Sequence, residues 1–97
     1  MSKSALSKDS IPFLPRGVKV KVDTVRERTV LLAPERTLAL DGTGISIMEL
    51  IDGENTLDQI VGILAQKYDA PKQTIGNDVV AFTRDLINRG YLEIKGG

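Results

Sequence analysis

The sequence predicts a small α+β domain in which a three-stranded antiparallel sheet is followed by three helices and a short terminal strand. Two patterns lead to this fold class. Up to residue 40, apolar residues alternate with polar ones or form short β-branched runs, which is typical of strands. From residue 41 onward, apolar residues recur at spacings of three and four, which is typical of amphipathic helices. The chain has 97 residues, which allows one domain with a modest core.

Three short strands are predicted in the first half of the chain. Valines and lysines alternate from Val18 to Val22 and therefore occupy opposite faces of the first strand. Thr29 to Leu32 is β-branched and apolar, as expected for a second strand. Pro34 has no amide hydrogen and is expected in the turn that follows. Arg36 to Leu40 is the third strand, and short turns between the three predict an antiparallel sheet.

Three helices are predicted after the sheet. Asp41 can cap the first helix, which we expect to end at Gly53. Thr56 opens the second helix with a capping-box pattern, T-L-D-Q. Pro71 suits the first turn of the third helix, and Gly90 suits its C-terminal end. This succession of elements is typical of a winged helix-turn-helix.

The two ends of the chain have different predicted roles. Tyr91 to Ile94 is expected to add the short terminal strand. Residues 1–14 are rich in Ser and Lys, and prolines at positions 12 and 15 interrupt any regular element there. We therefore predict a flexible tail or linker over residues 1–14 and a single domain over residues 15–97.

The chain contains neither cysteine nor histidine. This composition excludes a thiolate nucleophile, a disulfide, an imidazole base and a zinc site of the Cys/His type. A calcium-binding loop pattern is absent, and Gly42-Thr43-Gly44 lacks the Lys that completes a phosphate-binding loop. We predict a protein with no catalytic activity, no metal site and no cofactor.

Basic and acidic residues number 13 each, so the formal net charge is zero. The electrostatic attraction that drives non-specific binding to nucleic acid is therefore missing at the level of the whole chain. Basic residues are in excess up to Met48 and acidic residues after it, which we interpret as solvated surface. No apolar run approaches the roughly 18 residues of a membrane span, and the N-terminus lacks the pattern of a secretory signal. We expect a cytoplasmic protein without nucleic-acid or membrane partners.

The strand from Arg36 to Leu40 and the apolar stripe of the third helix form a candidate peptide-binding site. An edge strand leaves backbone donors and acceptors unpaired, so an extended segment of another chain can pair with it. Apolar side chains of that segment would enter an adjacent groove. The alternative is that the helix stripe is ordinary core, because buried and groove-lining side chains look alike in a sequence.

Four motifs together resemble the PqqD family of pyrroloquinoline quinone biosynthesis. They are Val30 to Leu40 (VLLAPERTLAL), Asp52-Gly53, Gln66 to Pro71 (QKYDAP) and Arg89 to Leu92 (RGYL). The resemblance covers about Pro15 to Leu92. Where that family commonly has Asn-x-Thr-Ala, this chain has Asp-Gly-Thr-Gly at positions 41–44, which leaves the local details of that turn open.

The resemblance implies a non-catalytic adaptor. Such an adaptor binds the leader of the precursor peptide PqqA by strand addition and presents it to the radical S-adenosylmethionine enzyme PqqE, which joins a glutamate to a tyrosine. It is expected to be a monomer or a weak homodimer. The resemblance implies a role in peptide binding for seven residues: Arg36, Leu38, Leu40, Ile75, Val79, Phe82 and Leu86.

Two of these residues have specific expected roles. Phe82 is a rigid aromatic that could anchor the peptide if it is partly exposed. Arg36 could pair with a carboxylate of an acidic leader, or it could form an ordinary surface ion pair with a neighbour.

Other functions stay open at the level of sequence. A winged helix could bind DNA, but basic side chains on the third helix are offset by Asp78 and Asp85. The same fold could serve another modified-peptide pathway. A small enzyme would need a pair of perturbed groups in a cleft, and the carboxylates of this chain fall on predicted polar faces.

Overall fold

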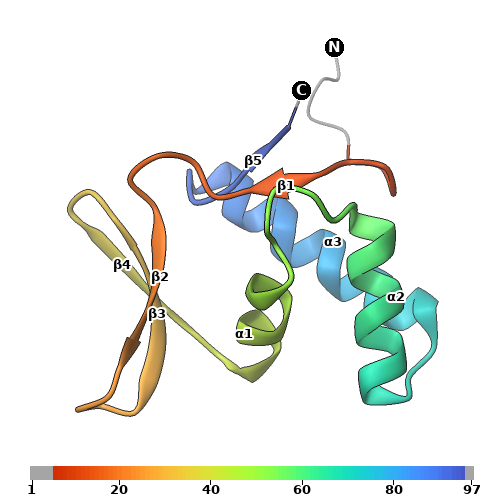
Figure 1. Ribbon diagram of the computed structural model, residues 1–97, viewed down its shortest axis with the longest axis horizontal. Coiled ribbons are helices and arrows are strands. Elements are labelled where there is room, and N and C mark those ends of the chain that lie inside the picture. The colour runs from red at the N-terminus through yellow and green to blue at the C-terminus, as the bar shows by residue number, and fades with distance from the viewer. Residues whose placement is uncertain (1–5, 96–97) are drawn as a thin grey trace.

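The computed structural model describes residues 6–95, in which a three-stranded sheet lies beside three helices (Figure 1). The sheet consists of β2 (Lys19–Asp23), β3 (Arg28–Ala33) and β4 (Arg36–Leu40). It is antiparallel, in the order β2-β3-β4, as the sequence predicts. Because β3 is central, β2 and β4 are the two edge strands of this sheet.

The helices begin at residues that cap them. The carboxylate of Asp41 accepts a hydrogen bond from the Gly44 amide at the start of α1 (Gly42–Glu49), which ends four residues before the predicted Gly53. Thr56 and Gln59 form the predicted capping box of α2 (Leu57–Tyr68). Proline precedes α3 (Lys72–Asn88), the longest of the three.

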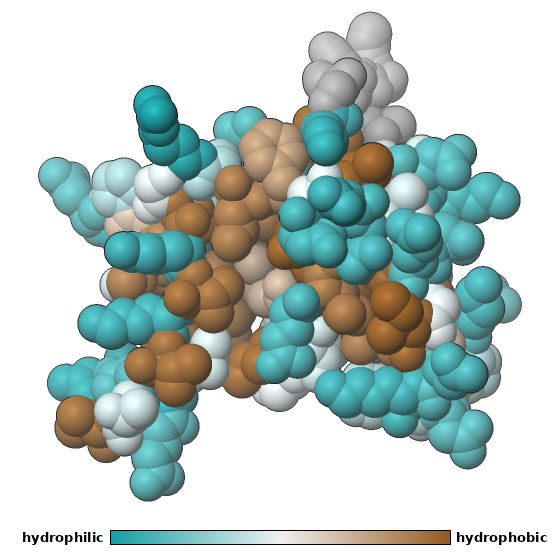
Figure 2. All heavy atoms as spheres, in the orientation of Figure 1, coloured by the Kyte–Doolittle hydropathy of each residue, from teal (hydrophilic) through white to brown (hydrophobic). Residues whose placement is uncertain are grey.

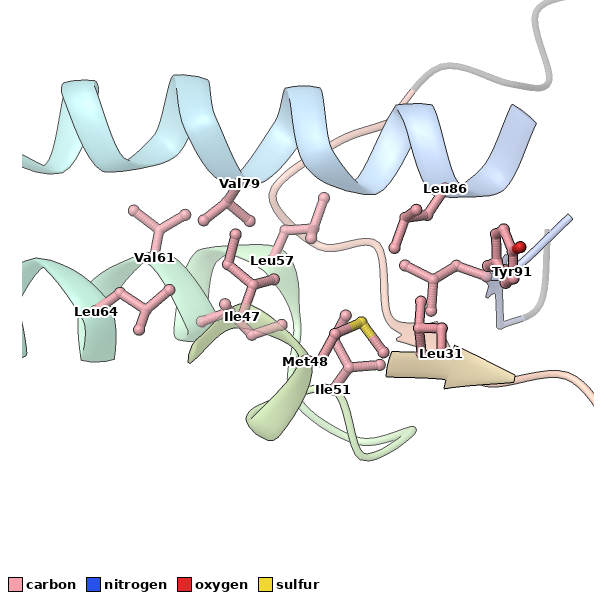
Figure 3. Close-up of a cluster of buried hydrophobic side chains, with 12 residues drawn as sticks. Leu31, Ile47, Met48, Ile51, Leu57, Val61, Leu64, Val79, Leu86 and Tyr91 are labelled. Carbon is pink, nitrogen blue, oxygen red and sulfur yellow. The ribbon is translucent and has the colours of Figure 1, made fainter. Parts of the chain in front are cut away.

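The core lies where the three helices meet one face of the sheet (Figure 3). Leu31 of β3 is fully buried, and the cross-strand register places it opposite Leu38 of β4. Thr83 of α3 is also fully buried, and its hydroxyl has no hydrogen-bond partner among the described residues. The other buried apolar residues of the core come from every helix and the C-terminal segment: Ile47, Met48, Ile51, Leu57, Ile60, Val61, Leu64, Val79, Leu86, Tyr91 and Leu92.

A second, two-stranded sheet joins the two ends of the described chain. It consists of β1 (Pro12–Phe13) and β5 (Glu93–Ile94), which pair antiparallel. The sequence predicts β5 but not β1, because two prolines obscure it. The carbonyls of Lys8 and Ser10 also accept hydrogen bonds from the first amides of α2. Residues 6–14 of the predicted flexible tail thus include a short strand and two backbone hydrogen bonds with α2, and residues 1–5 lie outside the described structure.

Within residues 6–95, no helix combines the length and the apolar character that crossing a membrane requires.

Candidate functional site

A hollow of about 250 Å³ lies between β4 and α3. Leu38 and Leu40 share one face of β4, because they are separated by one residue. Phe82 and Leu86 lie one turn apart on α3 and face them across the hollow. Its full lining is Leu38, Ala39, Leu40, Asp41, Phe82, Asp85, Leu86 and Arg89.

Four of the seven predicted residues thus meet in this hollow, and three do not line it. Val79 and Leu86 are both 1% exposed, so the structure places them in the core, although Leu86 also forms the floor of the hollow. Ile75 is partly buried and packs against the core. Phe82 is also only partly buried, which is the condition under which an aromatic can contact a partner.

Arg36 joins β4 to the end of α3 instead of pointing freely to solvent. Its Nη1 donates to the carbonyl oxygen of Arg89 at 2.6 Å, and its guanidinium lies 4.8 Å from the ring centroid of Tyr91. Gly90 permits this approach, because it has a positive φ of 83° and a Cβ there would come within 3.2 Å of the guanidinium. Arg36 therefore holds the two walls together at one end of the hollow.

The polar rim of the hollow carries both signs of charge. Arg89 Nε donates to Asp85 Oδ1 at 3.1 Å, and both side chains are more than half exposed. Asp41 lies at the opposite end of the hollow, where its carboxylate accepts a hydrogen bond from the Gly44 amide in α1. Exposed pairs of this kind contribute at most about 1 kcal/mol to stability, so they remain available to a ligand.

Gly44 is a part of the site that the sequence pattern does not single out as functional. A Cβ at this position would lie 3.0 Å from Phe82 Cε1 and 3.5 Å from Leu40 Cδ2. The absence of a side chain therefore allows Phe82 to sit against α1 beside Leu40. The only signal in the sequence is the departure of this turn from the Asn-x-Thr-Ala pattern.

The register of the β3–β4 hairpin shows which backbone groups of β4 are free. Ala33 pairs with Arg36 across a two-residue turn, so this closing pair exchanges backbone hydrogen bonds. Hydrogen-bonded pairs alternate, which directs the amide of Leu38 toward β3. The amides and carbonyls of Thr37 and Ala39 therefore face the outer edge of β4, next to the hollow.

The arrangement suits the binding of an extended peptide. Backbone groups of Thr37 and Ala39 can pair with an added strand, and alternate side chains of that strand can enter the apolar hollow. Among residues 6–95, no cluster of three or more acidic side chains could hold a metal ion. Asp52 has its pKa lowered by hydrogen bonds from the amides of Asn55 and Glu54, but this loop lies between α1 and α2 and does not line the hollow.

Comparison with known proteins identifies the family of this chain. Residues 28–92 match the family model "Coenzyme PQQ synthesis protein D (PqqD)". A Rhizobium meliloti "PqqA binding protein" is 45% identical over 92% of this chain and 91% of its own length. The bifunctional coenzyme PQQ synthesis protein C/D of Methylorubrum extorquens is 43% identical over 93% of this chain, which spans only 24% of that protein.

Solved structures show the same fold. The solution structure of the PqqD truncation of Methylobacterium extorquens PqqCD matches with a TM-score of 0.81 and 43% identity, over 96% of this chain and 99% of that one. It is described as a functional, stand-alone recognition element for a ribosomally synthesized and post-translationally modified peptide. PqqD from Xanthomonas campestris matches with a TM-score of 0.55 and 38% identity, over 88% of this chain and 94% of that one. By its family-model match and these relatives, the chain belongs to the PqqD family.

Proposed function

We propose that this protein is a non-catalytic adaptor that binds the leader of PqqA at the outer edge of β4 and presents it to PqqE. The observation that carries the proposal is the open edge of β4 beside an apolar hollow lined by Leu38, Leu40 and Phe82. The identity of the peptide follows from the names of the relatives, several of which are PqqA binding proteins. Presentation to PqqE and a monomeric or weakly dimeric state belong to the same proposal.

Strand addition suits a flexible peptide, because it adds backbone hydrogen bonds to apolar side-chain contacts. A free peptide is flexible, so ordering it on binding costs free energy that contacts must offset. Backbone hydrogen bonds at Thr37 and Ala39 are independent of peptide sequence, while the hollow selects apolar side chains. Holding the leader on a protein that also binds the enzyme would raise the effective concentration of the substrate at the active site.

An NMR titration of the labelled protein with synthetic PqqA tests the proposal. We expect amide shifts over β4 and the segment of α3 that contains Phe82 and Leu86, and no shifts with duplex DNA at low salt. A second arm adds PqqE to the peptide complex and measures ternary binding. Absence of a response to peptide at high micromolar concentration would refute the adaptor function.

A further inference from the structure

One face of the three-stranded sheet lies away from the helices (Figure 1). Side chains alternate along each strand, and Leu31, Leu38 and Leu40 are among those that pack toward the core. The residues between them, such as Val30 and Leu32, point to the opposite side and do not belong to the core cluster. We call this side the outer face of the sheet. Figure 2 shows hydrophilic side chains along the left margin of the molecule, which is where Figure 1 draws the three strands.

The outer face is basic. It carries three exposed cations, which we call the outer cations: Lys19, Lys21 and Arg28. Asp23 is the acidic residue of the three strands on this face, and its carboxylate already accepts hydrogen bonds from two amides of the β2–β3 turn. Among residues 6–95, none of the outer cations forms a salt bridge. Three positive charges on this face are therefore not neutralised by the protein itself.

The edge strand β4 leaves the outer cations accessible. Its side chains on the outer face are those of Thr37 and Ala39, which are small and exposed. Each row of residues across the sheet runs from a small side chain on β4, past an apolar side chain on β3, to a lysine on β2. The two rows are Thr37–Leu32–Lys19 and Ala39–Val30–Lys21.

A peptide strand added to β4 places half of its side chains over the outer face. Residues that lie opposite each other in neighbouring antiparallel strands point to the same face of the sheet. Because the outward backbone groups of β4 belong to Thr37 and Ala39, the peptide residues that pair with these two point to the outer face. The peptide residues beside them point toward the hollow. The hollow therefore selects one half of the peptide side chains, and the outer face selects the other half.

We propose that the outer cations select a leader with acidic side chains at the two positions that pair with Thr37 and Ala39, and with apolar side chains at the positions beside them. The inference rests on the proposed function and specifies the peptide that the site accepts. Charge complementarity carries it, since a carboxylate over this face meets three cations that have no ion-pair partner.

The separation of the charges determines the size of the effect. Neighbouring strands lie about 4.8 Å apart, so the backbone of an added strand would be about 10 Å from β3 and about 14 Å from β2. Long side chains of opposite charge extend toward each other across this gap, over the small side chains of β4. The charges stay exposed to water, and salt screens them over about 8 Å at physiological ionic strength. The contribution to affinity is therefore modest, and it decreases as salt is added.

Nucleic acid fits the outer face less well than an acidic peptide. Affinity for a phosphate backbone rises with the number of cations that contact it, and this face offers three on a chain without net charge. The outer face also adjoins the edge at which the peptide is proposed to pair. A bound peptide would therefore cover part of this face in every complex.

The test removes the outer cations and, separately, three cations elsewhere. The outer-face variant carries Lys19→Gln, Lys21→Gln and Arg28→Gln. The helix variant is the matched control, because it removes two exposed lysines and one exposed arginine from α2 and α3, outside the lining of the hollow: Lys67→Gln, Lys72→Gln and Arg84→Gln. Calorimetry measures the Kd of each protein for synthetic PqqA at low salt and at high salt, and thermal unfolding checks that each is folded.

We expect the outer-face variant to bind PqqA at least about threefold more weakly than the wild type at low salt, and within about twofold of it at about 1 M salt. The helix variant should bind within about 1.5-fold of the wild type under both conditions, because its charges lie away from the added strand. Equal affinities of the outer-face variant and the wild type at low salt would overturn the inference. An equal loss in the helix variant would also overturn it, since net charge alone would then explain the result.

A second peptide shows whether the leader carboxylates are responsible. In this peptide every Asp and Glu of PqqA is replaced by Asn or Gln. The wild type should bind it at least about threefold more weakly than PqqA at low salt, and the outer-face variant should bind it as the wild type does. A loss in the outer-face variant that is the same for both peptides would overturn the inference. Failure of the wild type to bind PqqA at all would instead refute the proposed function, so the two failures are distinct.

Discussion

The edge of β4 can be tested by removing one backbone donor. Ala39→Pro deletes an amide that faces the outer edge and takes no part in the β3–β4 ladder. Proline is tolerated at such edge positions because the domain itself loses no hydrogen bond. Leu38→Pro would not test the same point, because the amide of Leu38 faces β3 and its loss would weaken the sheet.

The expected magnitude follows from one backbone hydrogen bond. A single bond of this kind contributes about 0.5–1.5 kcal/mol net, so the Kd for PqqA peptide should rise by about 2- to 13-fold. Isothermal titration calorimetry measures the Kd, and thermal unfolding monitored by circular dichroism checks that the variant remains folded. The melting temperature should stay close to that of the wild type.

Two controls separate the lost donor from other effects. Ala39→Val keeps the amide and adds two carbons on the face of β4 opposite Leu38 and Leu40, so it reports the effect of a larger side chain alone. Val20→Pro removes an outward-facing amide from β2, the other edge strand, and should leave PqqA affinity unchanged. An unaltered Kd for a folded Ala39→Pro protein, or an equal loss for Val20→Pro, would refute strand addition at β4.

Four further substitutions test individual parts of the structure. Gly44→Ala should push Phe82 into the hollow and weaken peptide binding measured by calorimetry, because the new Cβ would lie 3.0 Å from the ring; unchanged affinity would contradict this geometry. Thr83→Val should raise the melting temperature by about 4–8 °C, since replacing a buried hydroxyl without a partner is worth about 1 kcal/mol; a lower melting temperature would show that the hydroxyl is satisfied. If Arg36 only joins β4 to α3, Arg36→Gln should lower the affinities for an acidic and a neutral peptide, measured by calorimetry, by the same factor. A larger loss of affinity for the acidic peptide would support direct pairing of Arg36 with a peptide carboxylate. Asp52→Ala should lower the free energy of unfolding at pH 7 in urea titrations. Because the folded pKa of Asp52 is below its unfolded value, this difference should begin to shrink as the pH falls below about 4 and should continue to shrink until the folded pKa is passed; a difference independent of pH would contradict it.

The sequence predicts the order of most elements because residues within or next to each element determine where it begins or ends. Asp41 and Thr56 cap helices with their own side chains, and the two-residue turn after Ala33 sets the β3–β4 hairpin. The short strand β1 has no such local cause, since Pro12 and Phe13 form a strand only because β5 lies beside them. The spacing of apolar residues along the sequence does not reveal long-range pairing of this kind.

The candidate site was predictable only in part, because α3 serves both the core and the groove. Val79 and Leu86 lie on the buried face, and Phe82 lies at its margin, although all three belong to one apolar stripe. The difference depends on the position of β4, which only the folded structure supplies. Arg36 illustrates the same limit, since its contacts with Arg89 and Tyr91 join residues more than 50 positions apart in the chain.

An edge strand that accepts a peptide, as proposed for β4, also has to avoid pairing with other copies of itself. β4 is only five residues long, and Arg36 at its first position is drawn toward α3, which narrows the accessible edge. The border of the hollow carries three charged residues, Asp41, Asp85 and Arg89. A strand with apolar side chains at these positions would have to remove water from the charges without pairing them, which costs free energy. The same features that restrict self-association therefore favour a peptide with apolar side chains at alternate positions and polar groups near its ends. Specificity in this small domain would thus come from the apolar hollow and its charged border, and affinity that does not depend on peptide sequence from the backbone edge of β4.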